Sequence, residues 1–143
     1  MNKESSKASL HYARKANQLA KRALTTFDEF LSTFVRTPGQ QNSQKPRKFA
    51  EDEIRPVMLA HFYSARLHSR LITVNPNEYI RNITRSLAEY RIVVSIVENH
   101  VQYHPRSPVQ NAEELKIARD MCNLLPVRLT RLARGEPIAA VNA

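Results

Sequence analysis

The sequence predicts an all-α fold in which about four long helices pair into two antiparallel hairpins, the building unit of tetratricopeptide-like α-solenoids. Three observations support this prediction. Apolar residues recur every three or four positions through four long segments, which is the period of one helix face. The breaks between these segments contain proline, glycine or asparagine. The 143 residues include only two glycines, fewer than the tight turns of an all-β fold require.

The first segment, residues 1–36, is expected to form one long helix, and residues 37–50 are expected to form a flexible basic loop. The loop contains two prolines, a glycine and almost no apolar residue, which is typical of a connection. Its basic residues are Lys45, Arg47 and Lys48. The apolar side of the helix is formed by Leu10, Ala13, Ala20, Leu24, Phe27, Leu31 and Phe34.

Residues 51–134 are expected to form a three-helix region, and two of its helices begin with clear signals. The acidic residues 51–53 suit the start of the second helix, where the helix dipole is positive. Asn75 is a candidate N-cap of the third helix. Pro76 then occupies the first helical position, and Glu78 is a capping-box partner.

The fourth helix is expected to open with the same capping-box spacing, at Asn111 and Glu114. Pro126 lies in the middle of its apolar pattern and is expected to kink the helix near Cys122. A glycine and a proline follow within residues 135–137, so we expect residues 135–143 to form a frayed tail.

Charge and composition narrow the class of protein. The 22 Lys and Arg residues exceed the 13 Asp and Glu residues, and the net charge of +9 favours acidic partners. Residues 1–7 lack the apolar core of a secretory signal, and no apolar run approaches the roughly 20 residues of a membrane-spanning helix. The single Cys122 cannot form an intramolecular disulfide, which suits a reducing compartment. We therefore expect a soluble, cytoplasmic protein.

The residues that could carry catalysis or bind a metal form no recognisable constellation in the sequence. His100 and His104 would share one helix face, but a zinc site needs at least a third ligand. His61 and His68 lie on the apolar side of their helix, where a histidine with a hydrogen-bond partner is the common case. Cys122 lies on the buried side of its helix and lacks the exposed setting of a nucleophile. We therefore predict no catalytic, cofactor-binding or metal-binding residues, and we expect that the protein is not an enzyme.

Four arginines are the candidate partner-binding residues. Arg66 and Arg70 lie one turn apart on the second expected helix, and Arg81 and Arg85 lie one turn apart on the third. Arginine is enriched in protein interfaces, so these residues favour a protein partner with acidic patches. We expect no small-molecule substrate. Nucleic acid is a weaker alternative, because the aromatic residues that could stack on bases mostly fall on buried helix faces.

Short runs of residues in the second to fourth helices carry information beyond their periodicity. They are residues 54–60, Phe62, residues 65–67, residues 71–73, Asn75-Pro76, residues 86–90, Met121 and residues 124–126. In order and spacing these runs resemble the C-terminal region of the KIF-binding protein family. The resemblance covers about residues 51–131 and is faint in the first helix, where only residues 9–12 carry it.

The resemblance implies a curved, right-handed α-solenoid of tetratricopeptide-like hairpins without a cofactor. It also implies a cytoplasmic, cytoskeleton-associated adaptor that binds kinesin motor domains and blocks their attachment to microtubules, which influences organelle transport and neuronal development. Family members are several times longer, so the chain resembles only their C-terminal end. Two alternatives stay open: a structural C-terminal cap that contacts no motor, and charge-driven binding to nucleic acid or another anionic surface.

Overall fold

In the computed structural model, which describes residues 3–35 and 48–141, the chain is built from helices that pack against one another. The elements are α1 (Lys3–Val35), α2 (Glu51–Arg70), α3 (Pro76–Tyr103), the short 3₁₀ helix η1 (Pro108–Asn111), α4 (Glu113–Ala133) and α5 (Ile138–Val141). The described residues contain no strand. The predicted all-α, solenoid-like fold of four long helices is therefore confirmed.

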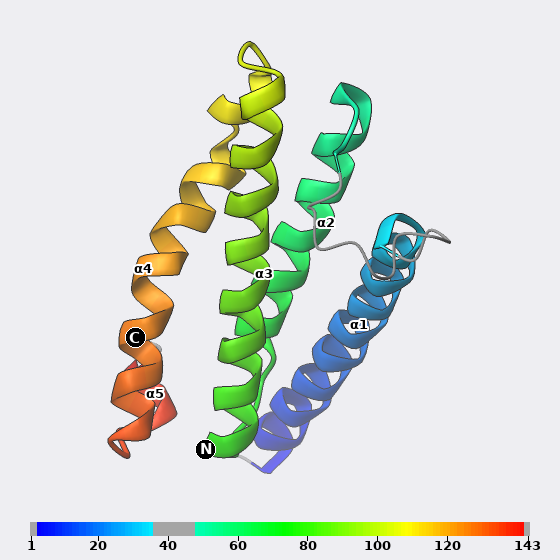
Figure 1. Cartoon of the computed structure of the whole chain (residues 1–143). Helices are drawn as coiled ribbons and strands as arrows, with labels where there is room; N and C mark the ends of the chain where they lie inside the picture. Colours follow the sequence, from blue (N-terminus) through cyan, green and yellow to red (C-terminus); the bar gives the residue numbers. More distant parts are fainter. Residues whose placement is uncertain (1–2, 36–47, 142–143) are drawn as a thin grey trace.

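The long helices form a curved row (Figure 1). α3 lies between α2 and α4 and packs extensively against both, whereas α1 packs on the other side of α2. α2 and α4 touch each other only slightly, so they stand apart on the two sides of α3. This arrangement leaves a concave surface over α3, with α2 and α4 as its walls.

The main hydrophobic core follows α3, because its apolar residues face both neighbouring helices. Ile83 and Val93 are completely buried there. The other buried members of this core are Ile54, Met58, Phe62, Ala65, Tyr79, Leu87, Tyr90, Val97, Val109, Ala112, Leu115, Ala118, Leu125, Leu132 and Val141. A smaller cluster joins α1 to α2 through Leu31, Val57 and Ala60. α1 therefore depends on a much smaller apolar contact than the other long helices.

A pair of hydrogen bonds fixes α1 to the connection between α2 and α3. The side-chain amide of Asn17 donates from Nδ2 to the carbonyl oxygen of Ile72 at 2.8 Å. Its Oδ1 accepts from the backbone N–H of Ile72 at 3.0 Å. The amide side chain thus satisfies both backbone groups of one residue in a segment that is not helical.

The start of α3 confirms the predicted N-cap at Asn75. Its Oδ1 accepts from the backbone N–H groups of Asn77 and Glu78, at 3.0 and 3.2 Å. The predicted capping box closes through one more residue. The carboxylate of Glu78 accepts from the hydroxyl of Thr73, and that hydroxyl accepts from the backbone N–H of Asn75.

Two expectations about the C-terminal part are wrong in detail. Asn111 does not open α4: it ends η1, and Ala112 is the N-cap of α4, because Ser107 caps a separate 3₁₀ turn at Pro108. The expected frayed tail instead contains α5, whose Val141 is 2 % exposed. Gly135 adopts a positive φ of 85°, which turns the chain back so that α5 can pack on α4. As for the expected kink at Pro126, α4 continues as one helix through this residue.

The expected flexible loop falls almost entirely outside the described residues, which resume at Lys48. Lys48 itself places its Nζ 4.2 Å from the centre of the Tyr103 ring, at the end of α3. None of the helices within the described ranges is long and apolar enough to cross a membrane.

Candidate partner-binding groove

The concave surface over α3 is a groove of about 710 Å³. α2 and the segment that follows it form one wall, α3 forms the floor, and α4 and α5 form the other wall. Its lining residues are Phe62, Arg66, Ser69, Arg70, Leu71, Ile72, Thr73, Tyr79, Tyr90, Ile117, Met121, Arg128 and Ile138. The groove is therefore built from segments up to 76 residues apart in the sequence, from Phe62 to Ile138 (138 − 62 = 76).

Three arginines give the groove its positive charge. Arg66 and Arg70 come from α2, one turn apart, and Arg128 comes from α4 on the opposite wall. All three act on the phenol of Tyr90, which lies between the walls on α3. Burial raises the pKa of Tyr90, and the three guanidinium groups oppose this rise. The lining contains no Asp or Glu among the described residues, so the positive charge of the groove is not neutralised from within.

Buried aromatic rings lie beneath the groove, and one of them has a hydroxyl without a hydrogen-bond partner among the described residues. Phe62 and Tyr90 pack edge to face, with ring centroids 5.8 Å apart. Tyr79 is 2 % exposed, and its hydroxyl oxygen has no hydrogen-bond partner within the described part of the chain. Burial raises the pKa of the Tyr79 phenol, so both tyrosines stay neutral at physiological pH and add no negative charge.

A groove with basic walls and an apolar floor suits one kind of ligand. An acidic segment of another protein could pair its carboxylates with the arginines and pack an apolar side chain on the floor. Fork-shaped guanidinium groups bind carboxylates through two hydrogen bonds, and interface centres are enriched in arginine and aromatic residues. The groove is therefore the candidate site for a protein partner.

The four arginines predicted from the sequence do not act together, because they lie on two different faces. Arg66 and Arg70 line the groove, whereas Arg81 and Arg85 do not. Arg81 is exposed on α3. Arg85 is held within the fold: its Nη2 lies 3.1 Å from Oε1 of Glu89 and 3.8 Å from Oδ1 of Asp28 on α1.

Sequence reasoning missed Arg128, the third arginine of the groove. The pattern of α4 shows Arg128 only as a polar residue among apolar ones near the end of an amphipathic helix. Its alignment with Arg66 and Arg70 depends on how α4 packs on α3, and periodicity along one helix does not reveal that packing.

The expectation that His61 and His68 have hydrogen-bond partners is confirmed. Nδ1 of His61 lies 2.6 Å from Oε2 of Glu89, and Nδ1 of His68 lies 2.8 Å from the carbonyl oxygen of Ser64. Cys122 lies on the other side of the row, in a hollow between α3 and α4, and burial raises the pKa of its thiol. A protonated thiol is a poor nucleophile.

Another group of ionisable side chains lies at the opposite end of α2 and α3 from the groove. His100 and His104 come from the end of α3, and Glu51 comes from the first turn of α2. One ligand atom from each lies within 4.8 Å of the other two. Of the described residues, these three could hold a metal ion.

Comparison with known proteins identifies relatives along most of the chain. The family model described as "KIF-1 binding protein C terminal" matches residues 1–132. The chain is 35 % identical to the KIF-binding proteins of Mus musculus and Homo sapiens, over 85 % of this chain and 18 % of theirs. It is 22 % identical to the KIF-binding protein of Drosophila melanogaster, over 83 % of this chain and 19 % of that protein. The chain thus spans less than a fifth of the length of these relatives, and no solved structure matches it significantly.

Proposed function

The chain belongs to the KIF-binding protein family, and from that premise we propose that it is part of a kinesin-binding adaptor whose basic groove holds an acidic segment of a kinesin motor domain. One observation carries the proposal. Arg66, Arg70 and Arg128 converge from two helices on an apolar floor without an acidic residue among the described lining residues. A surface of this kind supports binding to a protein partner and not catalysis.

The energetics favour a partner that is acidic and also partly apolar. Arginines at the edge of a groove raise the association rate of an acidic partner, but salt screens much of this effect. An apolar side chain that packs against the half-buried Ile117, Met121 and Ile138 of the lining adds up to about 1.5–3 kcal/mol, and salt does not screen this contribution. Binding that combines the two should persist at physiological ionic strength.

Occupation of the groove also suggests how such an adaptor could regulate a motor. A motor domain bound along α2 and α4 has the adaptor attached to it, and the adaptor sterically hinders the attachment of the motor to microtubules. We accordingly infer a cytoplasmic, cytoskeleton-associated protein that influences organelle transport and cytoskeletal organisation.

The test is direct binding of the purified chain to a kinesin motor domain by titration calorimetry, at about 50 and about 150 mM salt. Circular dichroism first establishes that the chain is helical. Saturable, stoichiometric binding at the higher salt concentration is the expected result. A well-folded chain that does not bind any motor domain at either salt concentration contradicts the proposal. Binding that falls steeply with salt and occurs equally with nucleic acid would instead identify a non-specific anionic partner.

A second candidate function, a structural cap of a longer solenoid, is favoured by the surface of α1. This helix packs mainly against α2, and its outward residues Leu10, Tyr12 and Leu19 are 52, 69 and 56 % exposed. An apolar surface of this kind suits contact with another helical hairpin. A folded chain that binds no motor, in the experiment above, supports this function.

A further inference from the structure

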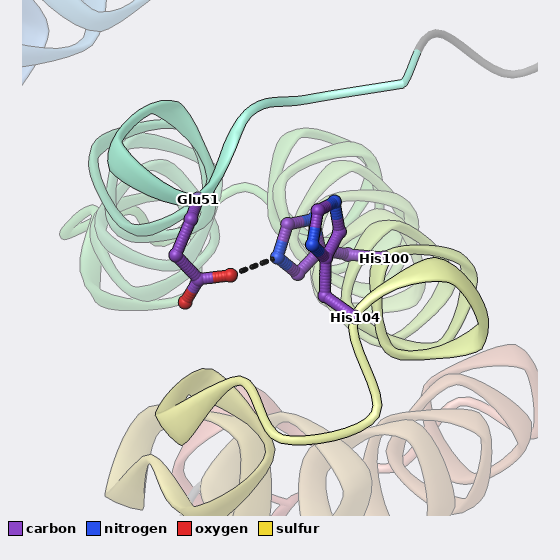
Figure 2. Close-up of side chains that lie close together, drawn as sticks. All are labelled: Glu51, His100 and His104. Atoms are coloured by element: carbon purple, nitrogen blue, oxygen red, sulfur yellow. Dashed lines mark hydrogen bonds and ion pairs between the residues drawn. The ribbon is translucent and has the colours of Figure 1, made fainter.

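At the end of the row opposite the groove, three side chains from two helices meet (Figure 2). Nε2 of His100 lies 2.7 Å from Oε2 of Glu51. The ring of His104 stacks on that of His100, with centroids 4.4 Å apart and an angle of 20° between the planes. The hydroxyl of Ser107 donates to Oε1 of Glu51 at 2.6 Å and so fixes the carboxylate in place. Glu51 and His100 are thus held by the packing of α2 on α3, and His104 stacks on His100 from the exposed side.

A second observation points to a ligand at this cluster. His100 is 4 % exposed, and its Nδ1 is buried without a hydrogen-bond partner among the described residues. Buried polar atoms without a partner are uncommon in folded proteins, and a bound ion at the ring is one explanation for such an atom.

The surroundings provide access and partly balanced charge. Glu51 and His104 line a hollow of about 500 Å³, and His104 also lines, with His100, a smaller hollow of about 80 Å³. An ion can enter through the larger hollow, and water there can complete its coordination. Asp52 and Glu53 follow Glu51 in the first turn of α2 and add negative charge. The C-terminal end of α3, at His104, also favours a cation through the helix dipole. Arg106 and Lys48 oppose a cation, but both are exposed and screened by solvent.

We propose that Glu51, His100 and His104 form a binding site for a transition-metal dication of the zinc type. Two imidazole nitrogens and one carboxylate oxygen are a common three-ligand set for zinc, whereas magnesium and calcium prefer oxygen ligands throughout. In tetrahedral zinc sites the ligand atoms lie about 3.4 Å apart, given bonds of about 2.1 Å. Here the ligand atoms lie within 4.8 Å, so small side-chain rotations bring them into range.

Mainly one residue must move before all three side chains can bind one ion. The nitrogen lone pairs of two stacked rings lie in nearly parallel planes and cannot both point at one ion. One ring must therefore rotate. His104 is the exposed C-cap of α3 and is free to change its rotamer, whereas His100 is buried. The ion then bridges Glu51 and the two imidazole rings, and so links the start of α2 to the end of α3.

The proposal is tested with the untagged chain after treatment with a chelator. Titration with Zn²⁺ by calorimetry measures stoichiometry and affinity, and the visible absorption of added Co²⁺ reports tetrahedral coordination. The expected result is one ion per chain and a tetrahedral cobalt spectrum. His104→Ala should weaken binding at least about tenfold. His11→Ala removes an exposed histidine on α1 and is the matched control, which should leave the affinity unchanged.

Two results would overturn the proposal. One is the absence of saturable Zn²⁺ binding to the wild-type chain, and the other is equal affinity in the wild-type and His104→Ala chains. Because His104 is exposed, its replacement should leave the helical signal intact, and circular dichroism checks this. Glu51→Gln provides an independent variant: it keeps a hydrogen-bonding group beside Ser107 but removes the anionic ligand, and it should also weaken binding.

Discussion

Nδ1 of His61 on α2 lies 2.6 Å from Oε2 of Glu89 on α3, although 28 residues separate them in the sequence. The other carboxylate oxygen of Glu89 lies 3.1 Å from Nη2 of Arg85. The Glu89 side chain is 4 % exposed, so a buried carboxylate is held between a histidine and an arginine. Arg85 is half exposed, but it pairs with this carboxylate and does not line the groove.

Removal of this buried carboxylate should destabilise the chain strongly. We predict that Glu89→Ala lowers the free energy of unfolding by about 3 kcal/mol, because it leaves His61 without its partner and leaves a cavity. Glu98→Ala is the matched control on the same helix. Its exposed pair with Arg119, at 3.8 Å, should contribute less than about 1 kcal/mol. Urea unfolding measures both values, and equal losses in the two variants would refute the prediction.

Two fully buried serines offer a second comparison. The hydroxyl of Ser86 donates to the carbonyl oxygen of Ala65 at 2.6 Å, whereas the hydroxyl of Ser64 has no partner among the described residues. Ser86→Ala should therefore cost about 1 kcal/mol of stability, and Ser64→Ala should be neutral or stabilising. Thermal unfolding of the two variants tests this difference. A larger loss in Ser64→Ala than in Ser86→Ala would contradict the hydrogen-bond pattern.

The end of α4 should show a dependence on pH. Nε of Arg131 lies 3.0 Å from Oε2 of Glu136, and its Nη2 lies 3.0 Å from Oε1. The hydrogen bonds from Arg131 lower the pKa of Glu136 below its ordinary value. A lowered pKa in the folded state means that the pair stabilises the fold above the unfolded-state pKa and that this contribution is lost as the pH falls through the folded-state pKa.

Glu136→Gln removes this contribution, so a comparison of the variant with the wild-type chain measures it. The melting temperature of the wild-type chain should exceed that of the variant at neutral pH. The difference should shrink between about pH 5 and pH 3, as the wild-type carboxylate becomes protonated. Melting curves recorded across this range test the prediction, and a difference that does not change with pH would exclude it.

The helices were predictable because their signals are local. The apolar period along residues 51–70 and 76–103, the N-cap at Asn75 and the acidic start at Glu51 all lie within one helix. The start of α4 was not predictable, because Ser107 caps a separate 3₁₀ turn and α4 begins after Ala112, whose side chain makes no cap hydrogen bond. Ser107 also donates to Glu51, which is 56 residues away in sequence, and no pattern along one helix reveals such a contact.

The candidate sites were predictable only in part, for the same reason. Arg66 and Arg70 share a helix face, which the sequence shows directly. Arg128 joins them only through the packing of α4 on α3. In the same way, His100 and His104 are visible as a pair four residues apart, whereas Glu51 reaches them across 49 residues. Contacts between helices depend on which faces pack together, and one sequence does not specify this.

The proposed function depends most directly on whether the groove arginines bind the motor. The decisive measurement is the affinity of a kinesin motor domain for Arg66→Glu/Arg70→Glu, compared with Arg14→Glu/Arg22→Glu, at about 150 mM salt. The control pair is exposed on α1 and changes the net charge by the same amount. We predict that the groove variant binds at least about tenfold more weakly than the wild-type chain, and that the control variant binds nearly as well as the wild-type chain. Equal affinities of the two variants would contradict it.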